Sequence, residues 1–105
     1  MANRHRGEIE ANIGGKTRVL CLTLGALAEL EGRLQVDDLI ALGEKFTAGR
    51  VSAKHLIAIL GAGLRGGGSE FSDEQVAQLS IANGLAGAAK IAADLLNATF
   101  GEAEG

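Results

Sequence analysis

The chain has few residues that could carry nucleophilic or metal chemistry. Cysteine occurs once, as Cys21, and histidine occurs twice, as His5 and His55. Cys21 lies in an apolar stretch with no base beside it, so we interpret it as a small hydrophobic side chain and not a nucleophile. The three residues have no metal-ligand spacing, and we expect His55 to be an ordinary surface or interface residue. We therefore predict no metal site.

Two acidic pairs resemble candidates for general acid–base catalysis. Glu29 and Glu31 are two positions apart, and residues at that spacing on a helix point to different sides, so they cannot form a carboxylate dyad. We expect them to solvate the helix or to present charge to a partner. Asp37 and Asp38 fit the first turn of a helix, where the helix dipole favours anions. Because no catalytic constellation remains, we predict that the protein is not an enzyme.

The glycines at positions 61, 63 and 66 match the Gly-x-Gly-x-x-Gly pattern of dinucleotide-binding proteins. That pattern binds a pyrophosphate only when a strand precedes it and a helix follows it. Here the glycines come at the end of a predicted helix, and no Gly-Lys-Ser/Thr sequence forms a P-loop. We therefore predict that no nucleotide or other cofactor binds.

Length and charge limit the remaining function classes. The 105 residues are 47% hydrophobic and carry a net charge of −3, which indicates a single soluble domain without general affinity for nucleic acid. The basic cluster at residues 4–6 lies in the N-terminal tail, where a polar and mobile segment is the ordinary state.

Membrane insertion and secretion are not predicted. The longest nearly continuous apolar run, Leu56 to Leu64, is much shorter than the roughly 20 residues of a spanning helix. No apolar segment follows the basic N-terminus, so a secretory signal is not expected. A single cysteine allows no intramolecular disulfide, and we expect a cytoplasmic protein, with association with a particle left open.

Residues 8–22 have the alternation of a half-buried hairpin. Ile9 and Ile13 alternate with polar residues, and Gly14-Gly15 reads as a two-residue turn. This register places Ile13 opposite Lys16 and Ile9 opposite Leu20. Because an isolated hairpin is marginal in water, we expect helices to cover its apolar face.

Helical spacing follows from about residue 24 onward. Helices are predicted over about 24–33 and 36–47, from Ala53 into the glycine-rich run 61–68, from residue 73 through Ile81, and over about 85–99. The fold class is thus α+β, an N-terminal β-hairpin packed on a bundle of about four to five short helices. Residues 7–100 form the domain, residues 1–6 are a disordered tail, and residues 101–105 fray.

Local signals set the expected helix ends. Thr23 and Ser52 are predicted N-caps, and Ser72 with Gln75 has the spacing of a capping box. Gly25 lowers helix propensity, which suggests close packing against the first turn of its helix. The run 61–68 lowers it progressively, and we expect it to become a flexible loop.

Three segments together resemble the small gene transfer agent family proteins of alphaproteobacteria. They are Ile-Gly-Gly-Lys at 13–16, Leu-Thr-Leu-Gly-Ala-Leu-Ala-Glu-Leu-Glu at 22–31, and Ala-Gly-Leu-Arg-Gly-Gly-Gly at 62–68. The resemblance covers approximately residues 7–87. It implies a role in building a phage-type tail, because members are encoded among phage-like tail genes.

The family carries two functional labels. One is a tail tube component; the other is a tail assembly chaperone, which binds the tape measure protein before the tube polymerises. Tube subunits are built on larger β-sandwiches, whereas this chain offers one hairpin, so the chaperone is favoured. The alternatives are a structural tube component, or a small adaptor or regulatory domain for a host protein.

A chaperone for a helical, hydrophobic client needs an apolar groove or a helix face of small residues. The last helix and the glycine-rich loop are the candidates, with residues 66–69 moving to admit the client. The alternative is that the small residues of the last helix pack it onto the protein's own core, since close-packed interiors also use small residues. We therefore predict contacts with tape measure protein or other tail proteins, and leave open a homo-oligomer. The predicted partner-binding residues are Gly84, Gly87, Ala88, Ile91, Ala92, Leu95, Leu64, Arg65, Gly66 and Gly67.

Overall fold

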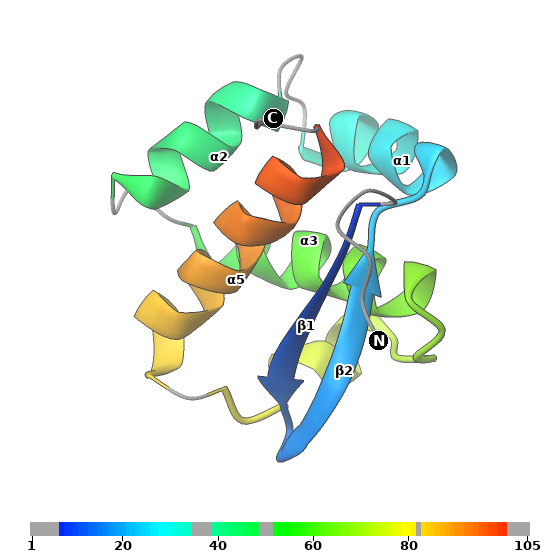
Figure 1. Ribbon diagram of the computed structural model, residues 1–105, viewed down its shortest axis with the longest axis vertical. Coiled ribbons are helices and arrows are strands. Elements are labelled where there is room, and N and C mark those ends of the chain that lie inside the picture. The colour runs from blue at the N-terminus through cyan, green and yellow to red at the C-terminus, as the bar shows by residue number, and fades with distance from the viewer. Residues whose placement is uncertain (1–6, 35–38, 49–51, 82, 101–105) are drawn as a thin grey trace.

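A computed structural model describes residues 7–34, 39–48, 52–81 and 83–100 of the chain. In this part, an antiparallel hairpin is followed by five helices (Figure 1), which confirms the predicted α+β class. The two predicted tails, His5 and the pair Asp37–Asp38 lie outside the described residues.

The hairpin consists of β1 (Glu8–Ile13) and β2 (Lys16–Cys21). Ile13 pairs with Lys16 and Ile9 with Leu20, so the predicted register is confirmed. Both turn glycines have positive φ, 66° for Gly14 and 83° for Gly15, as a primed two-residue turn requires. The apolar alternation therefore places Ile9, Ile13 and Leu20 in the core.

A short β-bridge joins the hairpin to a distant part of the chain. Ile81 pairs antiparallel with Ile13, and the Gly14 amide donates to the Ser80 carbonyl at 2.8 Å. The predicted helix through Ile81 is therefore wrong. The chain leaves the helical path before Ile81 because its backbone groups there pair with the hairpin.

The helices α1 (Leu24–Leu34) and α2 (Leu39–Thr47) follow the hairpin. Thr23 caps α1 as predicted, since its hydroxyl accepts from the Ala26 amide at 3.1 Å. The close packing expected at Gly25 is wrong: a Cβ there would meet nothing within 4 Å. Gly25 therefore lowers the stability of α1 without a packing gain in the monomer.

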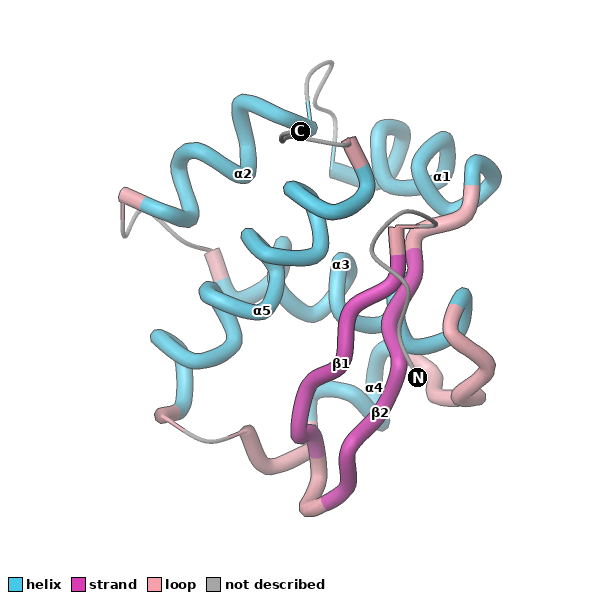
Figure 2. Tube along the Cα trace, viewed as in Figure 1, coloured by secondary structure: helices cyan, strands magenta, loops and turns pink. Residues whose placement is uncertain are grey.

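The helix α3 (Ala53–Gly66) lies at the centre of the domain. It packs against β2, α1, α4 and α5, and Figure 2 shows it behind the hairpin and α5. Ser52 occupies its N-cap position but forms no side-chain capping bond. Large side chains from β1, β2, α1, α3 and α5 meet around it and are essentially inaccessible: Ile13, Leu20, Leu30, Ile59, Leu64, Leu95 and Leu96.

The glycine-rich end of α3 is packed against β2. The helix continues to Gly66, and a Cβ built on Gly66 or Gly67 would lie 2.0 Å from the carbonyl oxygen of Cys21 or Val19, respectively. The helix thus ends within the 61–68 run, as predicted, but the run does not become the expected flexible loop at residues 66 and 67, because these glycines pack against β2. The low helix propensity of glycine is outweighed because only glycine lets the two backbones approach this closely.

The last helices are α4 (Asp73–Ala77) and α5 (Gly84–Thr99). The capping box is confirmed: the Ser72 amide donates to Gln75 Oε1 at 2.8 Å, and the Gln75 amide donates to Ser72 Oγ at 3.1 Å. After Ala77 the amides of Gln78 and Leu79 bond three residues back, so α4 tightens into a turn. By contrast, α5 spans the domain beside α2, α3 and β1.

Candidate functional site

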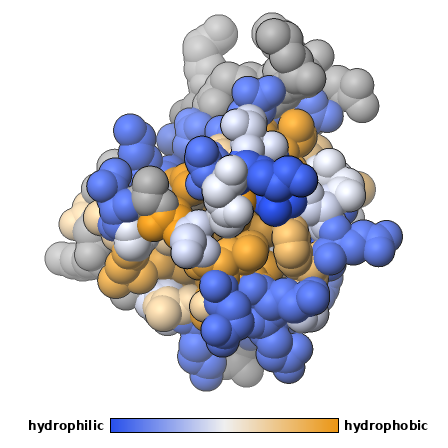
Figure 3. Space-filling model, turned by 90° about the horizontal axis from the view of Figure 1, so that it is seen from below, coloured by the Kyte–Doolittle hydropathy of each residue, from blue (hydrophilic) through white to orange (hydrophobic). Residues whose placement is uncertain are grey.

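An apolar groove lies where α3, α4 and the start of α5 meet. Its volume is about 210 Å³. On the face seen from below, apolar side chains gather between polar ones (Figure 3). The lining of the groove comes from α3, from α4, from the residues between α4 and α5, and from the start of α5. It consists of Ala53, Leu56, Ile57, Leu60, Val76, Ala77, Leu79, Ile81, Gly84, Leu85 and Ala88. Leu85 is 55% exposed, which leaves an apolar side chain at the rim for a partner to cover.

A second groove, of about 280 Å³, runs between β1 and α5. Its lining combines apolar residues such as Ile91 with charged ones such as Glu10, Lys90 and Asp94. This mixed lining is less suited to a hydrophobic client than the apolar groove.

The structure divides the predicted partner-binding residues among four environments. Gly84 and Ala88 line the apolar groove, and Gly87 and Ile91 line the second groove. Three others are core residues with exposures of 0%: Leu64, Ala92 and Leu95. Thus only part of the predicted set lies where a partner could reach it in the monomer.

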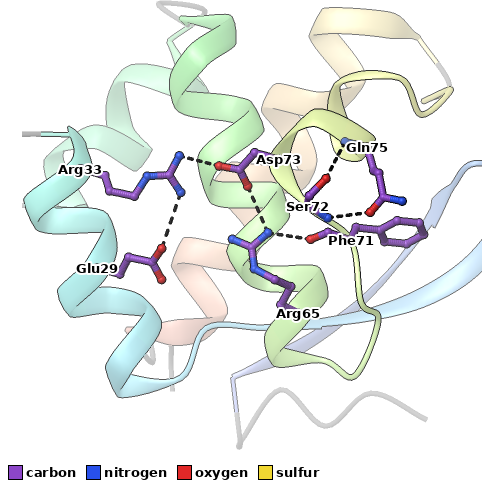
Figure 4. Close-up of polar contacts among 7 residues, drawn as sticks. All are labelled: Glu29, Arg33, Arg65, Phe71, Ser72, Asp73 and Gln75. Carbon is purple, nitrogen blue, oxygen red and sulfur yellow. Dashed lines mark hydrogen bonds and ion pairs between the residues drawn. The ribbon is translucent and has the colours of Figure 1, made fainter.

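The remaining three predicted residues lie at the end of α3. Gly66 and Gly67 pack against the backbone of β2, and the predicted movement of residues 66–69 would have to break this packing. Arg65 belongs to an ion cluster, formed by Glu29, Arg33, Arg65 and Asp73 (Figure 4).

The ion cluster joins three helices. Asp73, the first residue of α4, accepts a hydrogen bond from Arg33 of α1 and another from Arg65 of α3, the latter at 3.1 Å. Arg65 also donates to the Phe71 carbonyl at 2.7 Å. On α1, a carboxylate oxygen of Glu29 lies 3.7 Å from a guanidinium nitrogen of Arg33. Asp73 therefore connects α4 to two other helices through one carboxylate.

The cluster favours the ionised form of Asp73. Partial burial acts to raise the pKa of its carboxyl group, but the hydrogen bonds and charges of Arg33 and Arg65 together outweigh it, so the pKa is lowered. The hydrogen bond and charge of Asp73 in turn raise the pKa of Arg33. The side chains of the cluster are between 25% exposed, for Asp73, and 53% exposed, for Glu29, so solvent screening limits the stability gained.

The other residues with candidate chemistry lie on separate elements. Cys21 is half-buried at the end of β2, and His55 is half-buried in the first turn of α3. Within the described ranges, no three His, Cys, Asp or Glu side chains gather closely enough to hold a metal ion. No helix there is both long and apolar enough to cross a bilayer.

The sequence alone did not single out the central residues of the apolar groove or of the ion cluster. Asp73 was expected only to begin a helix, and Arg33 comes from a helix distant in the chain. Leu85 gave a detectable signal, since it is a leucine in the first turn of α5 beside small residues. The ion cluster gave none, because pairing between distant residues leaves no local pattern.

The chain can be compared with known proteins. A family model described as "Phage tail tube protein, GTA-gp10" matches residues 6–102. No curated protein and no solved structure matches the chain. The family points to a structural, non-enzymatic role in a phage-like tail, with other tail proteins as partners. Because the match covers nearly the whole sequence, the chain belongs to the gene transfer agent family of phage tail tube proteins, GTA-gp10.

Proposed function

We propose that this protein is a tail assembly chaperone that binds the tape measure protein through its apolar groove. The observation that supports this function best is the groove between α3, α4 and α5, which is lined mainly by aliphatic side chains. Apolar side chains of a client helix gain free energy when they leave water for such a surface.

The composition of α5 supports helical client binding. Gly84 and Ala88 line the groove one helical turn apart, and small residues at that spacing let a partner backbone approach closely. The groove is large enough for one or two aliphatic side chains, so we expect the client to insert a few leucine-like residues and to leave the rest of its helix exposed.

Co-expression and pull-down with the tape measure protein encoded in the same tail gene cluster tests the proposal. Leu85→Glu places a charge at the groove rim and should weaken capture by about tenfold or more, since burying an unpaired charge is costly. Leu24→Glu is the matched control, because Leu24 is 84% exposed and begins α1, away from the groove. Circular dichroism should show both variants folded.

If Leu85→Glu and Leu24→Glu captured equal amounts of tape measure protein, the groove would be excluded as the binding site. If the unaltered chain captured no tape measure protein, the chaperone function would be excluded.

A structural tube subunit is the second candidate, and the family description favours it. In that case the protein would be present in purified particles at the stoichiometry of the tube. A chaperone would instead be captured with tape measure protein before assembly and be depleted from finished particles. Quantitative mass spectrometry of particles and of cell extracts distinguishes the two functions.

A further inference from the structure

Within the segment around α4, residues 69–80, Val76 is the only fully buried residue, while Phe71 and Leu79 pack partly buried against the core and the Ser69 amide donates to the Leu64 carbonyl. Among the helices and strands, α4 packs mainly against α3. Before α4, Phe71 lies under the Arg18 guanidinium, whose carbon is 4.9 Å from the ring centroid. After α4, the Ser80 carbonyl accepts from the Gly14 amide. Between these two attachments, α4 is held by the buried Val76 side chain and by Asp73.

The ion cluster supplies the polar part of this attachment. Arg33 reaches Asp73 from α1, although α1 packs mainly against α3. Arg65 reaches both Asp73 and the Phe71 carbonyl from α3. One carboxylate therefore connects a five-residue helix to two longer ones (Figure 4).

The same segment forms one wall of the apolar groove. Val76, Ala77 and Leu79 line it opposite α3 residues that include Leu56 and Leu60. Leu56 and Leu60 are each 2% exposed, so displacement of α4 would uncover apolar surface that is now buried.

Left-handed residues lie beside both ends of the segment. Gly68 has φ of 102°, and Asn83 and Gly84 have φ of 67° and 56°. A Cβ on Gly68 or Gly84 would meet nothing within 4 Å. These positions have space for the backbone rotations that a hinge needs.

We propose that residues 69–80 open as a local unit, that the links from Asp73 to Arg33 and Arg65 keep the unit closed, and that its opening widens the apolar groove. The inference goes beyond client binding because it concerns the free monomer. Short segments with few buried contacts are where local opening is expected.

Amide hydrogen exchange followed by NMR tests the opening directly. The amides of Val76, Gln78 and Leu79 form hydrogen bonds within the segment. In Asp73→Asn, their exchange should accelerate about tenfold, the factor expected from loss of charged hydrogen bonds at a partly exposed site. Amides within α3 and α5 should keep their protection.

Two further variants distinguish local opening, caused by loss of the ion cluster, from a mere decrease in the helix stability of α4. Arg33→Gln changes only α1, yet it should accelerate exchange of the same three amides. Glu74→Gln removes a charge from the first turn of α4 but leaves Asp73 in place, and it should have a clearly smaller effect.

The proposal is overturned if Arg33→Gln leaves the exchange rates of the three α4 amides unchanged, or if Glu74→Gln accelerates them as much as Asp73→Asn does. It is also overturned if amide exchange in α3 and α5 accelerates by the same factor as in α4. The last outcome would indicate global unfolding.

Widening of the groove has its own readout. In a Cys21→Ser background, a thiol placed by Leu56→Cys should react with a soluble disulfide reagent several-fold faster when Asp73→Asn is added. An unchanged rate would refute the widening even if α4 opens. Neither measurement uses tape measure protein, so failure of this inference and failure of the proposed chaperone function are distinguishable.

Discussion

The contact between α3 and β2 allows a sharp test through Gly66→Ala. A Cβ on Gly66 would lie 2.0 Å from the carbonyl oxygen of Cys21 and 3.1 Å from its carbonyl carbon. Both atoms belong to the backbone, so no side-chain rotation relieves the overlap. The end of α3 must move away from β2, which also disturbs the packing of Gly67 against Val19.

The magnitude follows from two opposing effects. Forcing one extra carbon into a packed interior costs about 1–3 kcal/mol, and more where backbone must move. Alanine recovers up to about 1 kcal/mol over glycine inside a helix, and less at the last helical residue. We therefore expect Gly66→Ala to lower the free energy of unfolding by about 2 kcal/mol.

Gly32→Ala is the matched control within α1. A Cβ on Gly32 would meet nothing within 4 Å, so the propensity gain is unopposed and stability should rise by about 0.5–1 kcal/mol. Urea unfolding followed by circular dichroism measures both changes, and Tm should move by about 4–8 °C per kcal/mol. If Gly66→Ala unfolded at the same urea concentration as the unaltered chain, the close approach of α3 to β2 would be disproved.

Three further predictions concern Asp73, Ser72 and the hairpin turn. The lowered pKa of Asp73 means that its contribution is complete above the unfolded pKa of about 4 and is lost as pH falls through the folded value. The stability difference between the unaltered chain and Asp73→Asn, measured by urea unfolding, should therefore shrink below about pH 4; a difference that grew on acidification would contradict this. Ser72→Ala should lower the free energy of unfolding by about 1 kcal/mol, because it removes the capping box. Ser80→Ala should leave Tm nearly unchanged in thermal unfolding, because the Gly14 amide bonds to the backbone carbonyl of residue 80, which alanine keeps. At Gly15, with φ of 83°, replacement by Asn should lower Tm less than replacement by Val, because Asn tolerates the left-handed region.

Local patterns predicted the hairpin and most helix starts. The alternation of Ile9 and Ile13 and the two turn glycines determine a register that few alternatives satisfy, because a one-residue slip would expose the apolar face. The capping box at Ser72 was equally predictable, since both of its hydrogen bonds lie within four residues.

Long-range packing could not be predicted from the same patterns. Glycine lowers helix propensity in any isolated segment, so the run 61–68 indicated a helix that gives way to a flexible loop, whereas the close approach of β2 requires glycine at positions 66 and 67. Ile81 fits helical spacing, but its backbone bridges to Ile13. The candidate site divides in the same way: the sequence pattern indicated that Gly84 and Ala88 share a helix face, and they line one groove, while the link from Arg33 to Asp73 depends on two distant helices meeting.

The bridge between Ile13 and Ile81 has a consequence for folding during synthesis. The hairpin leaves the ribosome before the helices, but its core side chains are covered by α3 and α5, and its turn bonds to Ser80 near the start of α5. Contacts between such distant segments form slowly because a long loop must close before they contribute. We therefore expect nascent chains that end before α5 to remain unfolded and sensitive to protease, and the domain to become protected only after its last helix has been released.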